Sequence, residues 1–232
     1  MGDIHGNLPA LEVCFAQAEK EGYDWLVHTG DVAGYGPFVT ECAEFLNLRN
    51  IPGVRGNFDE NLDEDSEESG SFDPDPAERA LAESSLDWAR RSVEHWARRW
   101  LIEMPFELRH SSGGWSVAVY HGTPIDLYSG LLPEMPEPRF VEYGDAADAD
   151  IVITGHVHRS FHKRVGNRHF VNPGSVGRPR DKDPRTGFAV IEIGGGVRVT
   201  FPRFAYDVER TARAIGERGL PSELSDLIRS GR

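Results

Sequence analysis

Residues 151–158 read IVITGHVH, an apolar run that ends at Gly155 and is followed by two histidines. The run is typical of a short strand, and a glycine lets the backbone approach closely where the strand ends. Alternate residues of an extended segment share a face, so His156 and His158 would present both imidazoles on the same side. The stretch therefore predicts a pair of metal-ligating side chains at the end of a strand.

Four other segments place metal-ligating side chains beside a glycine at a strand end. They are Asp3-Ile4-His5, Gly30-Asp31, Gly56-Asn57 and His121-Gly122. Each motif alone is weak, because a single histidine near a strand end is more often a structural residue. Five such motifs in one chain indicate a shared metal site.

The order of elements around the first motifs predicts an α/β protein. Apolar runs at 24–29 (DWLVHT) and 51–55 (IPGVR) are typical of strands. One helical pattern begins at Pro9, and a second covers roughly 38–49. Strand, loop and helix in repeated succession imply parallel strands with helices on their faces. The pattern from about 76 to 101 predicts one long packing helix.

The second half of the chain is rich in short strands. We expect them in FELRH, WSVAVYHG, IVITGHVH, RHFVNPGS, GFAVIEI and VRVTFPRF. The Gly-rich breaks between them suggest a second, mixed sheet. From residue 207 the apolar positions predict two amphipathic helices. Because the sequence contains neither a repeat nor a linker, residues 1–232 are expected to form a single domain.

The charge of the chain limits its partners. The net charge is −13, and the chain lacks the basic patches that nonspecific nucleic-acid binding requires. The acid is concentrated at residues 63–76, DEDSEESGSFDPDP, where we expect a solvated surface loop. A small phosphodiester or nucleotide held by metal ions in a cleft is compatible with this charge.

Two isolated cysteines, Cys14 and Cys42, suggest a reducing compartment rather than a disulfide framework. The chain has no secretory signal and no run of about 18 apolar residues, so we expect a cytoplasmic protein that does not enter the membrane. Only Met1 and Gly2 precede Asp3. A functional Asp3 would normally follow an apolar strand. Either this strand is missing here or the first functional residues extend from a free terminus; we expect the first, so that the native chain begins upstream.

The series GDIHGN, GDVAGYGP, GNFD, HG and GHVH resembles the calcineurin-like metallophosphoesterase superfamily, especially its small bacterial and archaeal phosphodiesterase-type branch. VNPGSVGRPRDKDPRTGFAVIEI and FAYDVERTARAI are also similar to that branch, so the resemblance covers nearly the whole chain. The expected architecture is a four-layer α/β/β/α sandwich of two mixed β-sheets flanked by helices. The metal site would lie at the carboxyl ends of the strands.

The resemblance implies two divalent metal ions. The first would be held by Asp3, His5, Asp31 and His158, and the second by Asp31, Asn57, His121 and His156. Carboxylate, amide and imidazole ligands suit manganese, iron or zinc, and we expect manganese. A hydroxide that bridges two ions can attack a phosphoester without a protein nucleophile. Asp31, Asn57 and His121 would therefore be catalytic, and Asn57 would also contact the substrate.

One residue departs from the pattern of the superfamily. Many members have Gly-Asn-His-Asp where this chain has Gly56, Asn57, Phe58 and Asp59. The histidine helps to protonate or stabilise the leaving oxygen, and Phe58 can do neither. General acid catalysis is typically worth about 10²–10⁴-fold, and members that lack this histidine are generally better phosphodiesterases than monoesterases. We therefore expect a phosphodiesterase, or a hydrolase of activated phosphoanhydrides such as dinucleoside polyphosphates.

Further residues are candidates for the surroundings of the site. Asp59 would orient His121 or a water and so act with the catalytic residues. Arg178 and Arg180 would contact the substrate, because guanidinium matches phosphate geometry, although both could equally be surface charges. Tyr35, which we expect two glycines to expose, is a weaker candidate for packing on the substrate.

The remaining histidines allow two interpretations each. His28 is either a core residue or a support of the site, and His162 and His169, in an expected hairpin, either line the cleft or are structural.

Three alternatives remain beside the diesterase. A phosphomonoesterase or protein phosphatase is disfavoured, because GDVAGYG lacks the Asp-Arg-Gly that follows the bridging aspartate in protein phosphatases. A non-catalytic scaffold of the same fold would tend to lose metal ligands, and here every expected ligand is present. A nuclease acting on long nucleic acids would need a basic surface.

Overall fold

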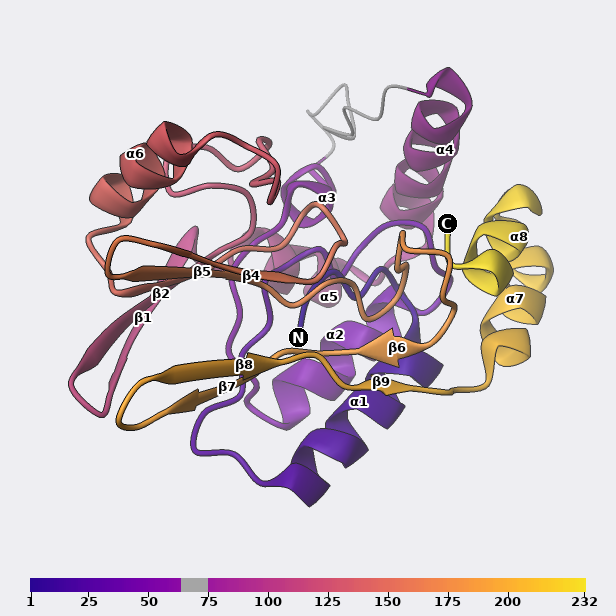
Figure 1. Ribbon diagram of the computed structural model, residues 1–232. Helices are drawn as coiled ribbons and strands as arrows, with labels where there is room; N and C mark the ends of the chain where they lie inside the picture. Colours follow the sequence, from indigo (N-terminus) through magenta and orange to yellow (C-terminus); the bar gives the residue numbers. More distant parts are fainter. Residues whose placement is uncertain (64–74) are drawn as a thin grey trace.

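The computed structural model describes residues 1–63 and 75–232, and the chain forms a mixed α/β fold within these ranges. Most of the acidic loop expected at 63–76 therefore lies outside the described residues. Figure 1 shows the helices on the two outer sides of the strands, with the amino terminus near the centre of the molecule.

The larger sheet has five strands in the order β1-β2-β3-β5-β4. They are β1 (Glu107–Ser112), β2 (Trp115–Tyr120), β3 (Ile151–Ile153), β4 (Phe161–Val165) and β5 (Arg168–Asn172). The central strands β2, β3 and β5 are parallel, whereas the edge strands β1 and β4 run antiparallel to their neighbours. The carboxyl ends of the three central strands therefore meet at one edge, and the β4–β5 hairpin is present as expected.

The remaining strands form two separate two-stranded antiparallel sheets. One pairs β6 (Thr186–Gly187) with β9 (Arg203–Phe204), and the other pairs β7 (Val190–Ile193) with β8 (Val197–Thr200).

Two segments that we predicted as strands, 24–29 and 51–55, pair only through one parallel bridge between His28 and Gly53. The predicted extent of these strands is therefore wrong. Pro52 accounts for part of the interruption, since it has no N–H to donate to a ladder. The neighbouring chain is still tied in, because the Thr29 N–H donates to the Met1 carbonyl over 3.0 Å.

The faces of the larger sheet explain the four layers. On β2, Val117 and Val119 join an apolar cluster with Val27 and Val54 from the two bridged segments. Their neighbours Ala118 and Tyr120 point to the opposite face, where α6 packs, as the alternation of a strand requires. The expected α/β/β/α order of layers is confirmed, with α6 on one outer side and the other helices on the second (Figure 1).

Eight helices are described. They are α1 (Leu8–Glu21), α2 (Val39–Leu48), α3 (Asn57–Glu60), α4 (Pro76–Ser92), α5 (His95–Ile102), α6 (Glu137–Ala147), α7 (Val208–Glu217) and α8 (Glu223–Ser230). The two helices predicted after residue 207 are confirmed, whereas α6 was not predicted. Within the described ranges, no helix combines the length and the apolar character that crossing a bilayer requires.

The single helix predicted from 76 to 101 is in fact two. It breaks after Ser92, where Val93 adopts an extended conformation with ψ of 131°. The next amide, the Glu94 N–H, donates to the Thr40 hydroxyl over 3.1 Å instead of to a helical carbonyl. A side chain from α2 thus takes the hydrogen bond that would have continued the helix.

Candidate metal centre

All seven predicted ligands meet where strands and extended segments end. Asp31 follows the segment that contains His28, and Asn57 is the first residue of α3. His121 follows β2 directly, and the Gly-His-Val-His motif follows β3. Crevices outside the carboxyl ends of parallel strands are the usual binding sites of α/β proteins. The convergence places three imidazole donors beside two carboxylates and an amide, with a fourth imidazole at the rim.

The first group of ligands is buried and compact. One ligand atom from each of Asp3, His5, Asp31 and His158 lies within 4.8 Å of all the others. The Nε2 atoms of His5 and His158 are 3.0 Å apart. Asp31 Oδ2 lies 3.7 Å from His5 Nε2, and Asp3 Oδ1 lies 3.6 Å from His158 Nε2. These four side chains can surround one cation.

The second group is centred on the amide of Asn57. Its Oδ1 lies 2.9 Å from His121 Nε2 and 3.0 Å from His156 Nδ1, and these two nitrogens are 3.2 Å apart. Asp31 Oδ2, which faces His5 in the first group, is also 3.5 Å from His121 Nε2. One carboxylate oxygen therefore borders both groups.

Backbone carbonyls determine which nitrogen each histidine presents. His5 Nδ1 donates to the Ala33 carbonyl over 2.7 Å, and His158 Nδ1 donates to the Arg178 carbonyl over 2.8 Å. A carbonyl only accepts, so each Nδ1 carries the proton and each neutral imidazole has a lone pair on Nε2. Two lone pairs that face each other at 3.0 Å repel, and a cation between them removes the repulsion.

The electrostatics of the cluster also favour a cation. Burial raises the pKa of both Asp3 and Asp31 well above the ordinary range, and the charge of Asp59 adds to both shifts. Burial lowers the pKa of His5 to about 3 and that of His156 to about 4, so these imidazoles are neutral and available as ligands. Asp3 Oδ2 is buried and has no hydrogen-bond partner within the described chain. The residues present therefore fit a bound metal ion.

The backbone at the ligands adopts an uncommon conformation. Five ligands have positive φ, namely Asp3 (49°), His5 (46°), Asp31 (48°), His156 (69°) and His158 (56°). Residues other than glycine adopt this region rarely, and each such residue costs of order 1–3 kcal/mol. Strain of this kind concentrates at functional sites, where the surrounding structure holds the side chains in place.

Asp31 is held by the turn that contains Asn57. The Phe58 N–H donates to Asp31 Oδ1 over 2.9 Å, which leaves Oδ2 directed to the two ligand groups. The contact requires Gly56, because a Cβ at that position would lie 2.1 Å from Asp31 Oδ1. Residues Asn57–Glu60 form the one-turn helix α3. The glycine of the Gly-Asn motif thus serves the neighbouring carboxylate.

Asp59 supports the site in a different way from the predicted one. Its carboxylate accepts from the N–H groups of Val32 and Ala33, both at 2.9 Å, and from that of Gly56 at 3.0 Å. The predicted orientation of His121 by Asp59 is wrong, because His121 Nδ1 donates to the Thr29 carbonyl over 2.8 Å. Asp59 instead joins the loop after Asp31 to the start of α3.

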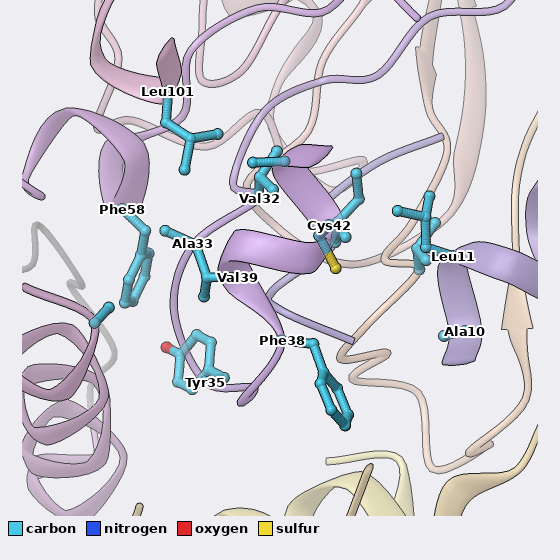
Figure 2. Packing of buried hydrophobic residues seen from close by; sticks show 14 of the residues in the cluster. Ala10, Leu11, Val32, Ala33, Tyr35, Phe38, Val39, Cys42, Phe58 and Leu101 are labelled. Carbon is cyan, nitrogen blue, oxygen red and sulfur yellow. The ribbon is translucent and has the colours of Figure 1, made fainter. Parts of the chain in front are cut away.

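Phe58 and Tyr35 form an aromatic wall beside His5. Phe58 is only 3% exposed, and its ring centroid lies 5.3 Å from that of His5 and 5.0 Å from that of Tyr35. Figure 2 shows the two rings on neighbouring segments of the core. Tyr35, expected to be exposed, is 5% exposed. Its flanking glycines let it turn inward, so the expectation of exposure is wrong.

The two predicted substrate-binding arginines have different environments. Arg178 is 1% exposed, stacks on Tyr35 with its guanidinium carbon 4.1 Å from the ring centroid, and pairs with Glu78 of α4. Arg180 is exposed, and its charge adds to the lowering of the His158 pKa that burial mainly causes. Both charges therefore lie near the first ligand group.

The remaining histidines lie outside the two ligand groups. His28 is buried in the core, where its Nδ1 accepts from the Gly30 N–H over 3.3 Å. His162 and His169 pair with each other over 2.8 Å on the β4–β5 hairpin. His169 also packs against Trp115, which supports the structural interpretation of this pair.

The main features that sequence reasoning missed are backbone carbonyls and a distant carboxylate. The carbonyls of Thr29, Ala33 and Arg178 orient three histidines, and no side-chain signal marks them. Glu78 lies 100 residues before its partner Arg178 in the sequence. Its position in the first turn of α4, after the acidic loop, resembles an ordinary helix-start carboxylate.

The fold and the site together define a metal-binding α/β protein of the phosphoesterase type. Residues 1–196 match the calcineurin-like phosphoesterase superfamily domain. The chain therefore belongs to the calcineurin-like phosphoesterase superfamily, whose members depend on metal ions.

Several relatives extend over the whole chain. A metallophosphoesterase structure from Sphaerobacter thermophilus is 27% identical, with a TM-score of 0.78, and the match covers 100% of this chain and 98% of that one. A hypothetical protein from Pyrococcus horikoshii, 21% identical with a TM-score of 0.82, shares the fold over 100% and 97% of the two chains. An uncharacterized protein of Methanocaldococcus jannaschii is 25% identical over 249 residues, covering 100% of this chain and 97% of its own.

One relative has a named activity, but the match is partial. The Escherichia coli phosphodiesterase YfcE is 38% identical over 72 residues, which are 27% of this chain and 39% of YfcE. The similarity supports membership of the superfamily, but a match over this part of the two chains does not identify the substrate of this protein.

Proposed function

We propose that the protein is a phosphodiesterase, or a hydrolase of activated phosphoanhydrides such as dinucleoside polyphosphates, that uses two divalent ions. The observation that carries this proposal is the position of Asp31 Oδ2, 3.7 Å from His5 in one ligand group and 3.5 Å from His121 in the other. A shared carboxylate oxygen is what a pair of neighbouring ions requires. The mixed donor set favours manganese, with iron or zinc as alternatives.

The chain's own residues hold and orient the reactants. When bound, two ions supply Lewis acidity that activates water and neutralises phosphoryl charge. The carbonyls of Ala33, Thr29 and Arg178 keep the histidine protons on Nδ1, so that the Nε2 atoms stay free for ligation. Asn57 offers an amide oxygen to the second ligand group and an NH₂ that can donate to a phosphoryl oxygen. Arg178, Arg180 and Tyr35 are proposed substrate contacts on the His5 side.

Phe58 supports the choice of substrate class. It occupies the position after Asn57 and lies against His5, and its ring cannot protonate a leaving oxygen. An alkoxide leaving group in a simple monoester suffers most from this loss, whereas an aryl or phosphate leaving group needs less help. We place the reaction in the cytoplasm, in keeping with the two free, buried thiols Cys14 and Cys42.

The test compares two substrates in the presence of Mn²⁺. We expect kcat/KM for bis-p-nitrophenyl phosphate to exceed that for p-nitrophenyl phosphate, and a clear preference for the monoester would overturn the diesterase assignment. In Phe58→His we expect activity on an alkyl phosphate monoester, whose alkoxide leaving group needs a proton, to rise by at most about 10²-fold, the low end of general acid catalysis. Phe58→Leu is the matched control, because it changes the packing without adding a proton donor. Equal behaviour of the two variants would mean that Phe58 is only a packing residue.

A further inference from the structure

The backbone of Arg178 is fixed to the metal site from several directions. Its carbonyl accepts from His158 Nδ1 over 2.8 Å. The Gly177 N–H and the Ser175 hydroxyl both donate to the Asp3 carbonyl, at 3.0 Å and 2.7 Å. The starting point of the Arg178 side chain is therefore set by the same residues that form the first ligand group.

The guanidinium of Arg178 is buried and only partly satisfied. It stacks on Tyr35, and one of its terminal nitrogens pairs with a carboxylate oxygen of Glu78. Its Nε is buried and has no hydrogen-bond partner within the described chain. A guanidinium presents five N–H donors in a planar fork that fits two oxygens of one anion. Here the fork lacks an acceptor at Nε.

The acceptor that is present comes from a more exposed element. The side chain of Glu78 is 20% exposed and belongs to the first turn of α4, whereas that of Arg178 is 2% exposed. Carboxylate and phosphate compete for the same donor geometry of a guanidinium, and phosphate can engage two N–H groups at once. A phosphoryl group that reached Arg178 could therefore displace Glu78 and satisfy Nε as well.

We propose that Arg178 forms an anion subsite for a second phosphoryl group of the substrate, and that Glu78 occupies this subsite when substrate is absent. The subsite rests on the proposed function, because the first phosphoryl group is the one at the ligand groups. It favours phosphoanhydrides, which carry a charged neighbour beside the reacting phosphorus, over simple diesters, which do not.

Tyr35 connects the subsite to the first ligand group. Its ring centroid lies 4.8 Å from that of His5 and 4.1 Å from the guanidinium carbon of Arg178. One aromatic ring therefore contacts both the guanidinium and a predicted metal ligand. A second phosphoryl group bound to Arg178 would thus be a neighbour of the phosphoryl group at the ligand groups.

A purely structural ion pair makes a different prediction. If the contact with Glu78 serves only to hold α4 on the core, removing the carboxylate leaves a buried charge unpaired and lowers stability without improving anion binding. If Glu78 occupies an anion subsite, removing it makes the binding of a two-phosphorus anion tighter. The two interpretations therefore differ in the sign of the effect on anion affinity.

The experiment measures binding of inorganic pyrophosphate and orthophosphate by calorimetry at a fixed free Mn²⁺ concentration. We expect Glu78→Gln to bind pyrophosphate about tenfold more tightly than the wild type, because the charged competitor for Arg178 is removed. Tenfold in affinity corresponds to about 1.4 kcal/mol of binding free energy. Orthophosphate, with a single phosphorus, should change by less than about twofold. Asp87→Asn is the matched control, since Asp87 is an exposed carboxylate on the same helix that pairs with Arg90, and the change should leave pyrophosphate binding as it is in the wild type.

A second variant tests the arginine. In Glu78→Gln/Arg178→Lys we expect the tenfold gain to disappear, because lysine keeps the charge but lacks the fork. Thermal unfolding shows whether each variant is folded. Pyrophosphate affinity in folded Glu78→Gln that is equal to or weaker than that of the wild type overturns the subsite, even if the protein hydrolyses diesters. A tenfold gain supports the subsite even if no phosphoesterase activity is found, so the two proposals fail separately.

Discussion

Two pairs of histidines in this protein have nearly the same nitrogen separation and different chemistry. His5 and His158 approach to 3.0 Å in the metal centre, and His162 and His169 approach to 2.8 Å on the β4–β5 hairpin. In the first pair both Nδ1 protons are committed to carbonyls, and a carboxylate lies within 3.7 Å of each Nε2. In the second pair, Nε2 of one ring meets Nδ1 of the other, so one shared proton satisfies both.

The comparison teaches that a short distance between imidazoles does not by itself define a metal site. The metal centre differs in three ways: the Nδ1 atom of each histidine donates to a backbone carbonyl, carboxylates lie nearby, and the residues have positive φ. The hairpin histidines have none of the left-handed backbone of His5 and His158. Three experiments, taken from the largest expected effect to the smallest, sharpen or break this distinction.

The largest effect is expected from Asp31→Asn. It removes the charge that borders both ligand groups, so we expect a loss of bound metal and of phosphodiesterase activity of roughly 10³-fold, several kcal/mol of transition-state stabilisation. Metal content measured on the purified protein and kcat/KM with bis-p-nitrophenyl phosphate report the two effects. His162→Ala is the control and should keep its metal and its activity. Loss of metal in His162→Ala would erase the difference between the two histidine pairs.

A smaller effect is expected from Asp59→Asn. The new NH₂ would face a backbone N–H group that now donates to the Asp59 carboxylate. Two donors cannot pair, so the loop after Asp31 would lose its fixed position. Residues that orient ligands typically contribute about 10–100-fold to metal affinity or activity. Titration with Mn²⁺ measures the change, and Glu60→Gln, on the same turn of α3, is the matched control. Equal titrations for the two variants would show that Asp59 does not position the ligands.

The smallest effect on the metal centre is expected at His28, a buried histidine outside it. Burial lowers its pKa to about 3, so the unfolded chain binds a proton here between about pH 6.5 and pH 3 that the folded protein does not. Stability is therefore fully present above pH 6.5 and falls with decreasing pH by about 1.4 kcal/mol per pH unit for this group. In His28→Gln we expect a shallower loss of the urea-derived unfolding free energy between pH 6.5 and 4.5. An unchanged slope would show that His28 is protonated in the folded protein.

The elements that hold the metal centre were largely predictable from the sequence. The three central strands and the Gly-His-Val-His motif follow from apolar runs that end at glycine, because a buried strand and a tight turn have strong local signals. The five motifs were expected to share one site, and the resemblance to the superfamily implied how their seven ligands are divided between two ions.

What could not be predicted depends on contacts between distant parts of the chain. The break before α5 results from a hydrogen bond between Glu94 and Thr40, and the inward direction of Tyr35 results from packing against Phe58. The role of Asp59 depends on amides of Val32 and Ala33 that a sequence pattern does not mark. Local sequence patterns identify the side chains that can bind a metal ion. Tertiary contacts determine which atom of each side chain points into the site.

The left-handed backbone at five ligands has a consequence for how such a site can be lost. Glycine would relieve the conformational cost at Asp3, His5 or His158, so substitutions that remove these ligands are favoured by the folded backbone alone. A glycine variant at one of these positions would therefore lose a metal ligand and at the same time lower the conformational cost of the backbone.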